Sequence, residues 1–366
     1  MTIGKRIFVP LSILVVLFIS ALAANYYYTS AKEKKSIYKD EIKKLTIFFN
    51  KEYKVKEDFG LTNAIMLSGN EFVTSMMMDG SKDYTEKGLK GLLAEFKKDT
   101  DLKNVKIQIH DPTAYSMLRV WDPTKFGDNL SSYRKTILHV IKTKKPLVAI
   151  EIGPLGLVLR GVAPIIEDHS YLGSVEFIQG FNSILKDAKR EKKEVIIVMK
   201  KQYLNIATAL KKSEMLGDYV LAVHKKNINL EFMNELKGID ISKSNTLLKS
   251  KNYIFVSVPM KDFSGKIVGY ALVGQNKKIV NKVVDSSMDS VFDQIVASLI
   301  AFLAFMLILY FIIKKAVLTP LSNLTQRAKE LSSGDGDLTQ KLEVNGNDEI
   351  ALASIEINNF IEKVRV

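Results

Sequence analysis

The chain has 366 residues, of which 47% are hydrophobic, and a net charge of +13. This length allows two or three domains, and the lack of any cysteine excludes disulfides and thiol chemistry. Residues 7–24 and 294–313 contain no charged side chain. Each run is long enough to cross a hydrocarbon core of roughly 30 Å as a helix, so a membrane protein with two spans is expected.

The first apolar run ends in "ALAA", a small-residue sequence at which a signal peptide is cleaved. The run is long for a signal, however, and a helical pattern continues beyond it, which favours an uncleaved anchor. Lys5 and Arg6 lie before the first span, and Lys314 and Lys315 follow the second. Because basic residues prefer the cytoplasmic side, both termini are expected in the cytoplasm and residues 25–293 in the periplasm or outside the cell.

The net charge can be divided between these compartments. The tip, residues 1–6, carries two positive charges, and residues 314–366 carry seven Lys/Arg against eight Asp/Glu, which leaves +12 on the outer part. Nucleic acid is not expected there as a partner. A basic outer domain favours anionic ligands or surfaces, although a solvated face accounts for most of these lysines.

The outer part begins with helical patterns. Apolar residues at spacings of three and four predict a long helix over 26–57, followed by helices over 61–78 and 84–98. Short β-branched runs bounded by Gly, Pro or Asp then predict strands. These strands are expected at 104–109, 146–152, 156–166 and 172–178, with a helix at about 131–143.

The second half of the outer part follows a similar order. Strands are predicted at 194–199, 253–260 and 267–274, and a helix at 204–216. The last two strands enclose "KDFSGK", a hairpin turn by composition. Since both halves end in strand, proline, acidic turn, glycine and strand, we expect two copies of one module, each an antiparallel sheet flanked by helices.

The end of the chain contains two heptad patterns. Apolar residues alternate spacings of three and four over 317–331 and again over 350–364. Such seams are buried only against other helices, which predicts a coiled coil. The connector between them, "SSGDGDLTQKLEVNGND", is too long for a tight turn.

Two stretches carry a resemblance to a known family. "HDPTAYSMLRVWDPTKFGDNLSSYR" followed by "EIGPLGLVLRGVAPI" resembles a subgroup of double Cache sensor domains of bacterial chemoreceptors. The resemblance is good over 60–185 and poor over 190–275. It implies an α+β membrane protein with two tandem PAS-like Cache modules: a long helix over 25–59, a membrane-distal module over 60–190 and a membrane-proximal module over 191–293.

The tail resembles a HAMP linker, in which two chains form a parallel four-helix coiled coil, and "GDGDLT" resembles the linkers of methyl-accepting chemotaxis proteins. The residues at the family's marker positions are Pro320, Gly334, Gly336, Leu338, Asp348 and Glu349. The resemblance implies a homodimer in the inner membrane and a cytoplasmic kinase or adaptor as partner. A chemoreceptor continues into a signalling hairpin, so the chain is interpreted as a fragment of one.

No enzyme is expected from the outer or inner part. The four histidines lack metal-ligand spacing, and no Gly-Xaa-Ser-Xaa-Gly elbow or phosphate loop occurs. Met76 to Met78 are interpreted as packing residues, because three successive positions do not share one helix face. No metal or cofactor is therefore expected.

A small-ligand site is expected in the distal module, where the stretch that begins at His110 covers the sheet. A pocket of this kind needs a few polar anchors among apolar walls. Arg119 offers a fork for a carboxylate and Trp121 a flat wall, as in Cache domains that bind amino acids. The full set of candidates is Arg119, Trp121, Tyr115, Ser116, Asp128, Glu151, Arg160 and Glu176.

Three of the candidates also have a structural interpretation. Asp128 fits an N-cap of a helix that begins near Ser131, and Trp121 fits the core. Arg160 lies in an otherwise apolar strand, where an unpaired charge is costly, so a paired or functional role is favoured. The sequence supports the sensor half of a chemoreceptor, with a histidine kinase, a cyclic-di-nucleotide enzyme and a non-signalling envelope binding protein as alternatives.

Overall fold

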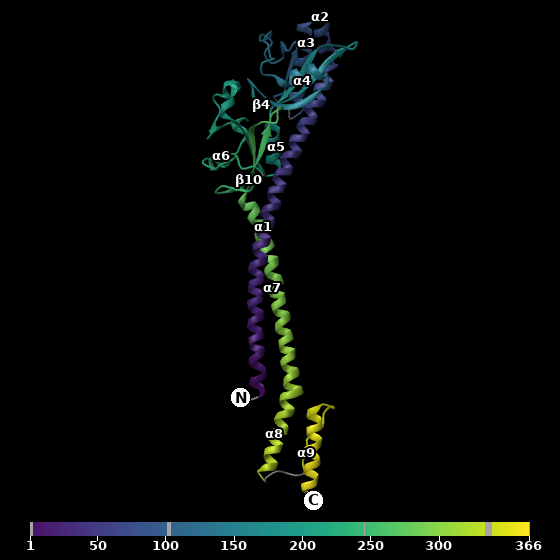
Figure 1. The fold of residues 1–366 in the computed structure, drawn as a ribbon, viewed down its shortest axis with the longest axis vertical. Coiled ribbons are helices and arrows are strands. Elements are labelled where there is room, and N and C mark those ends of the chain that lie inside the picture. The colour runs from purple at the N-terminus through teal and green to yellow at the C-terminus, as the bar shows by residue number, and fades with distance from the viewer. Residues whose placement is uncertain (1–2, 101–103, 245, 334–338, 366) are drawn as a thin grey trace. The chain divides into compact units, whose positions relative to one another are not determined.

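The computed structural model describes residues 3–100, 104–244, 246–333 and 339–365 (Figure 1). The chain divides into two units, which are described separately. The globular unit comprises residues 35–283, and the helical unit comprises residues 1–34 and 284–366. Two helices, α1 (Ile3–Ser68) and α7 (Lys277–Ile313), contribute to both units.

In the globular unit, α1 continues through Gly60 to Ser68, so the predicted helix boundary near Gly60 is wrong. The helix approaches the sheet closely at Gly60, and this approach requires a glycine at position 161 of a strand. A Cβ atom on Gly161 would lie 2.0 Å from the carbonyl oxygen of Gly60, so helix and strand meet backbone to backbone. Two shorter helices follow, α2 (Glu71–Asp79) and α3 (Lys82–Asp99). The side chain of Asn70 caps α2 by accepting a hydrogen bond from the amide of Phe72.

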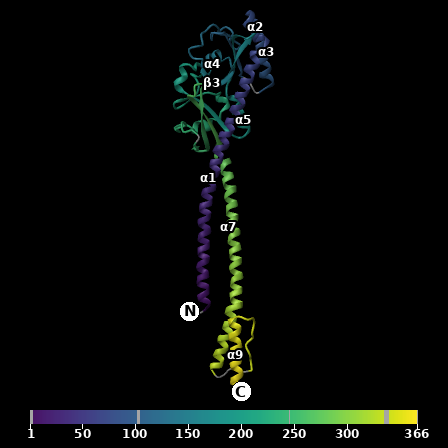
Figure 2. The same cartoon turned by 45° about the vertical axis from the view of Figure 1, so that its right-hand side comes forward.

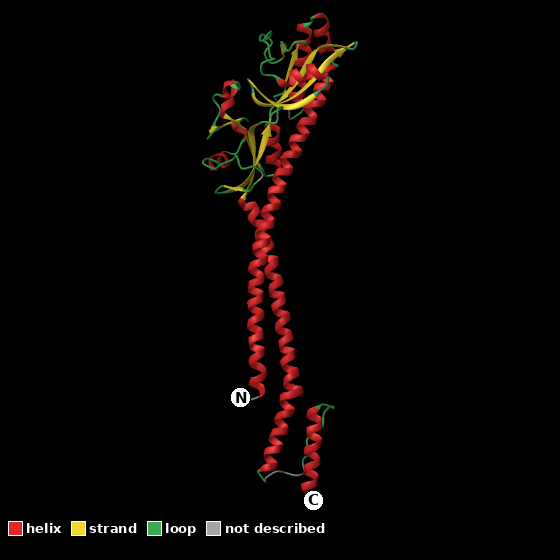
Figure 3. Cartoon of the chain, in the orientation of Figure 1, coloured by secondary structure: helices red, strands yellow, loops and turns green. Residues whose placement is uncertain are grey.

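The distal sheet contains five antiparallel strands (Figure 3). Their order is β2-β1-β5-β4-β3, with α4 and α5 after the second and fifth strands in the chain. The elements are β1 (Lys106–His110), β2 (Ser116–Arg119), α4 (Lys135–Thr143), β3 (Leu147–Gly153), β4 (Gly156–Glu167), β5 (Ser170–Gln179) and α5 (Asn182–Arg190). The sequence predicted four of these strands but missed β2, because that strand lies inside a stretch rich in turn residues.

The two faces of the distal sheet differ in chemistry because side chains alternate along a strand. One face is apolar and packs on α1, α2 and α3; its strand residues include Ile107, Ile109, Val175 and Phe177. The opposite face carries polar side chains that are also buried: Gln108, His110, Arg160, Ser174 and Glu176. This polar face lies under the connection from residue 111 to α4.

The proximal sheet repeats the plan. Its order is β7-β8-β6-β11-β10-β9, again antiparallel throughout, so the order around the central strands matches that of the distal sheet. The strands are β6 (Glu194–Lys200), β7 (Met215–Leu216), β8 (Tyr219–Leu221), β9 (Leu248–Lys249), β10 (Tyr253–Lys261) and β11 (Ile267–Asn276). The expectation of two antiparallel modules is confirmed.

Two predictions for the proximal sheet have different outcomes. The helix expected at 204–216 is wrong: this segment contains the end of a 3-10 turn (η1, Lys201–Asn205), a second 3-10 turn (η2, Thr208–Leu210) and β7. The hairpin turn is confirmed, since the amide of Gly265 donates to the carbonyl oxygen of Asp262 at 2.8 Å. The proximal module also contains η3 (Lys225–Asn227) and α6 (Leu230–Glu235).

The helical unit contains two helices that are long and apolar enough to cross a membrane. Figures 1 and 2 both show the first part of α1 beside α7, and the rings of Phe18 and Phe302 stack with centroids 3.8 Å apart. A short π-helical segment, Lys314–Leu318, joins α7 to α8 (Thr319–Ser332). The last helix is α9 (Glu349–Arg365).

The marker residues of the tail occupy distinct places. Pro320 lies in the first turn of α8, directly after the π-helical segment Lys314–Leu318. Asp348 caps α9: its Oδ1 accepts hydrogen bonds from the amides of Ile350 at 3.1 Å and Ala351 at 2.9 Å. Glu349 is the first residue of α9. Gly334, Gly336 and Leu338 lie outside the described residues.

Candidate ligand-binding site

A cavity of about 750 Å³ lies in the globular unit, against the polar face of the distal sheet. Its other walls are the stretch from Trp121 to Arg134, the β3–β4 turn and the 3-10 turn η2. The charged and aromatic residues that line it are Arg119, Trp121, Asp122, Lys125, Phe126, Asp128, Tyr133, Arg134 and Arg160. The cavity therefore combines cationic groups with flat apolar walls.

Local hydrogen bonds shape the covering stretch. Asp111 Oδ1 accepts from the amides of Thr113 at 2.8 Å and Tyr115 at 2.7 Å, and Ala114 adopts a φ of 69° in the same turn. The chain then enters β2, and an isolated bridge joins Tyr115 to Asn129. The stretch is thus folded back on itself before it reaches α4.

Arg119 and Asp128 form a bidentate ion pair at the cavity wall. Arg119 Nη1 and Nη2 donate to the two carboxylate oxygens of Asp128, each at 2.7 Å, and Nη1 also donates to the carbonyl oxygen of Lys125 at 2.8 Å. The hydrogen bonds from Arg119 hold the pKa of Asp128 below its usual value. The predicted N-cap role of Asp128 is wrong, because α4 begins at Lys135.

The other candidates from the same stretch lie in different surroundings. Trp121 lines the cavity, and the ammonium group of Lys106 lies 5.0 Å from the centre of its ring. Ser116 is buried and accepts a hydrogen bond from Gln108 Nε2 at 3.0 Å. Tyr115 is 41% exposed and does not line the cavity.

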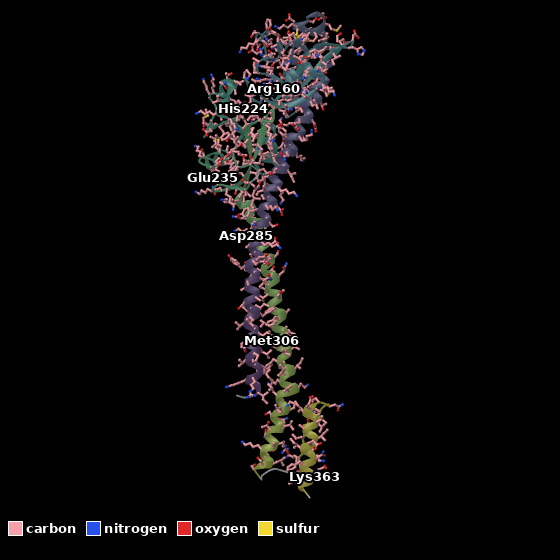
Figure 4. All side chains as sticks on the ribbon, viewed as in Figure 1. Arg160, His224, Glu235, Asp285, Met306 and Lys363 are labelled. Atoms are coloured by element: carbon pink, nitrogen blue, oxygen red, sulfur yellow. The ribbon has the colours of Figure 1, made fainter. Side chains whose placement is uncertain are left out.

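Behind the cavity, the polar face holds a network of buried charges (Figure 4 labels Arg160). Arg134 donates through Nε to Glu151 Oε2 at 2.7 Å and through Nη2 to Glu176 Oε1 at 2.5 Å. Arg160 donates through Nη1 to the same Glu176 oxygen at 2.6 Å. Thr136 donates through both its amide and its hydroxyl to Glu151.

This arrangement is balanced, with two carboxylates facing two guanidinium groups. Burial alone would raise the pKa of Glu176, but the charges of Arg134 and Arg160 outweigh it and hold that pKa well below its usual range. Burial and the charge of Arg134 lower the pKa of Arg160. Arg160 therefore has its counter-ion within the protein, as the sequence-based argument required of a buried charge.

His110 completes the network. Its Nδ1 is 3.0 Å from Ser174 Oγ, and its Nε2 is 3.5 Å from Glu176 Oε2. Burial lowers the pKa of His110, which favours the neutral imidazole. Nε2 of His110 and Oε2 of Glu176 lack a hydrogen bond among the described residues.

The structure thus separates the eight candidates into three groups. Arg119, Trp121, Asp128 and Arg160 line the cavity; Glu151 and Glu176 hold its guanidinium groups from behind, and Ser116 and Tyr115 lie aside. Sequence reasoning did not select His110, Gln108, Thr136 or Arg134. A signal for the first two was present, since both alternate with isoleucines in "KIQIH", a strand that is buried on both faces.

Two known protein families match this chain. A sequence family described as "Double sensory domain of two-component sensor kinase" matches residues 38–280, and the HAMP domain family matches residues 312–365. No curated protein matches the chain.

Three solved structures illustrate the similarity. The ligand-binding domain of the Campylobacter jejuni chemoreceptor Tlp3 in complex with L-valine is 11% identical, with a TM-score of 0.39, over 70% of this chain and 97% of that one. The Vibrio cholerae histidine kinase DctB sensor domain is 9% identical, with a TM-score of 0.35, over 69% and 98%. An extracellular ligand-binding receptor from Desulfohalobium retbaense is 11% identical, with a TM-score of 0.36, over 63% and 40%. Because the double sensory family spans more than half of its residues, the chain belongs to the dCache_3 family of double Cache sensor domains, here followed by a HAMP domain.

Proposed function

We propose that the chain is the sensor half of a transmembrane chemoreceptor and that its distal cavity binds a small molecule with a carboxylate group. The supporting observation is the cavity itself, which is built on a polar sheet face with three guanidinium groups at its wall. Guanidinium forks match carboxylates in a planar, bidentate geometry.

The charges at the wall refine the ligand class. Four basic side chains and two acidic ones line the cavity, namely Arg119, Lys125, Arg134 and Arg160 against Asp122 and Asp128. Arg134 and Arg160 are held by buried glutamates, whereas Arg119 is held by Asp128, which lies nearer the surface.

In this proposal a ligand carboxylate replaces Asp128 on Arg119. Asp128 and Asp122 are then available to accept hydrogen bonds from a ligand ammonium group. An α-amino acid supplies both groups, and an organic acid supplies the first. Trp121 provides a flat wall for the ligand's apolar part.

Transmission would follow the chain directly. The strand β11 ends at Asn276 and α7 begins at Lys277, so no linker separates the proximal sheet from the helix that crosses the membrane. Shifts of about 1–2 Å between packed helices suffice for switching of this kind. The ligand supplies only its difference in affinity for the two arrangements.

Ligand binding is tested with the full chain in detergent micelles. A thermal-shift screen against amino acids, organic acids, purines and amines is expected to give a hit among the first two classes. Arg119→Ala and Trp121→Ala should each abolish the shift. The matched control is Arg190→Ala, because Arg190 also forms an ion pair with one aspartate, at 2.8 Å, but lies on α5 outside this cavity. A hit that survives both cavity substitutions would place the ligand elsewhere.

A sensor kinase is the second candidate, favoured by the description of the family that matches residues 38–280. The chemoreceptor and the sensor kinase are distinguished by the protein that becomes phosphorylated when the ligand binds. The gene product that includes any residues encoded after Val366 is placed in nanodiscs with a chemotaxis kinase and its adaptor. Ligand-dependent phosphorylation of the added kinase supports the chemoreceptor, whereas ligand-dependent autophosphorylation of the chain itself would replace that proposal with the sensor kinase.

A further inference from the structure

A second cavity, of about 410 Å³, lies in the globular unit between α1, α5 and η3. Three lysines line it, each from a different element: Lys56 from α1, Lys186 from α5 and Lys226 from η3. His224, labelled in Figure 4, also borders it. Among the described lining residues none is acidic, and Val105 is the only one with an apolar side chain. The cavity is therefore basic and polar, unlike the distal cavity.

Lys56 is the central charge of this site. It is only 6% exposed, and its Nζ donates to Gln179 Oε1 at 3.1 Å and to Ser183 Oγ at 2.9 Å. Both acceptors are neutral, and Lys56 forms no ion pair with any residue that the structure describes. An ammonium group that is buried without a counter-ion is unfavourable, and one of its three N–H groups has no acceptor among the described residues.

The electrostatics of Lys56 agree with this geometry. Burial lowers its pKa to about 8, against the opposing effect of the negative charge on Asp187. Asp187 itself is engaged by Arg190 at 2.8 Å. Lys56 therefore still carries its charge at neutral pH, and an anion at the cavity would stabilise it.

Further donors lie at the same wall. Asn182 Oδ1 accepts hydrogen bonds from the amide of His224 at 3.0 Å and from Asn227 Nδ2 at 2.8 Å. The oxygen of the Asn182 side chain is thus engaged as an acceptor by the segment around η3. Its Nδ2 group then remains a donor, with no acceptor among the described residues.

We propose that this cavity binds a small tetrahedral oxyanion of the phosphate and sulfate class, held by the ammonium groups of Lys56, Lys186 and Lys226 and by the side-chain amide of Asn182. Lysines act as point charges around such an ion, in contrast to the planar forks of the distal cavity. Because polar and basic residues make up nearly all of the described lining, the cavity favours a fully polar ion over a ligand with a hydrocarbon part. Because the three lysines come from α1, α5 and η3, the bound ion ties the long helix to both modules and makes their packing sensitive to the anion.

The test is isothermal titration calorimetry with the full chain in nanodiscs. Inorganic phosphate and sodium sulfate are the probes, and sodium chloride at matched ionic strength is the reference. Saturable binding at one site per chain is expected for phosphate or sulfate and not for chloride. Lys56→Gln and Lys226→Gln should each raise the dissociation constant about tenfold or more, since each removes a charge-assisted hydrogen bond.

The control variant is Lys243→Gln, which removes an exposed lysine of the proximal module outside the cavity and should leave the dissociation constant unchanged. Lys226 is also exposed, so its variant remains informative if Lys56→Gln fails to fold. Heats that chloride reproduces would overturn the proposal, because they would reflect ionic strength alone. Saturable phosphate binding that Lys226→Gln leaves unchanged would overturn it as well. Neither result bears on the carboxylate ligand of the distal cavity, since the two cavities share no lining residue.

Discussion

Glu176 is fully buried and accepts hydrogen bonds from two guanidinium groups, one from the covering stretch and one from β4. Both arginines donate to the same oxygen, Oε1, so this carboxylate is the centre of the network. Its charge is present at neutral pH because its pKa lies well below the usual range. Removing the charge would leave Arg134 with one partner and Arg160 without its carboxylate.

We therefore predict that Glu176→Gln destabilises the protein by about 3–5 kcal/mol, the cost of leaving a buried charge without its partner. The melting temperature of the full chain in detergent should fall by roughly 10 °C. Glu167→Gln is the control, because Glu167 is exposed on the same β-hairpin and should change little. A melting temperature for Glu176→Gln within a few degrees of the wild-type value would contradict the paired network.

Lys56 gives a prediction about pH. Its pKa is about 8 in the folded protein and 10.5 in the unfolded chain. Between these values the unfolded chain binds more protons, so the free energy of unfolding rises with pH through this window. The lowering corresponds to about 3 kcal/mol at about 1.4 kcal/mol per pH unit.

The measurement compares wild type with Lys56→Met in phosphate-free buffer, because Met carries no titrating group. Below pH 8 the buried charge costs wild type its full penalty, and above pH 10.5 that penalty is gone. The stability of wild type relative to the variant should therefore increase by about 3 kcal/mol from pH 7 to pH 10.5. A constant difference between the two proteins across this range would mean that Lys56 is not buried as a charge.

At the residue scale, the sequence identified charges but not their partners. Arg160 stood out because it interrupts an apolar strand, Arg119 because its guanidinium group matches a carboxylate, and Glu176 only as an acidic candidate. The link from Arg134 to Glu176 spans 42 positions and depends on how β5 is placed under the covering stretch. Non-local pairing of this kind is set by the sheet order, which the sequence pattern does not specify.

At the scale of elements, the crossing of α1 and β4 depends on Gly161, which lies against the backbone of Gly60. The atoms nearest a new Cβ on Gly161 belong to the backbone of Gly60, at 2.0 and 2.5 Å, so a side chain there cannot be accommodated by a rotamer change. The helix or the strand must move instead. This contact positions α1 on the distal sheet.

We predict that Gly161→Ala destabilises the protein by roughly 1–3 kcal/mol through overpacking, measured by thermal unfolding of the full chain. Gly91→Ala is a matched control: Gly91 lies within α3, and nothing lies within 4 Å of a Cβ atom there. That control should be stabilising by up to about 1 kcal/mol, because alanine favours a helix over glycine. Equal melting temperatures for the two variants would argue against the backbone contact.

Elements with strong periodicity were predictable, and those fixed by tertiary contacts were not. The long strands β4, β5, β10 and β11 and both heptad helices follow from their apolar patterns. The expected break at Gly60 was wrong because α1 continues through Gly60 while its backbone packs closely on Gly161 of β4. The segment 204–216 has a helical pattern, but its backbone forms 3-10 turns and then β7. Its apolar side chains pack against the core of the proximal module.

At the scale of the whole molecule, a four-helix HAMP bundle requires two copies of the chain to associate. Helix α9 presents large apolar side chains to solvent in the single chain, and two of them, Phe360 and Val364, lie on its heptad seam. Seams of this kind are buried by parallel association of two chains into four helices. Since the chain lacks cysteine, one introduced thiol reports such association without interference.

We predict that Phe360→Cys forms disulfide-linked dimers on mild oxidation in membranes. Phe360 lies on the heptad seam of α9 and is 57% exposed in the single chain, so a partner is needed to cover it. A disulfide requires the two Cα atoms to lie closer than about 7 Å. Equivalent seam positions of two chains lie near the bundle axis and come close to this distance, whereas outward positions lie farther apart. Asn359→Cys, one residue earlier and facing away from the seam, should remain monomeric under the same oxidation. Equal cross-linking of both variants would indicate random collision, and no cross-linking at Phe360→Cys together with a monomer by mass in detergent would contradict the paired bundle.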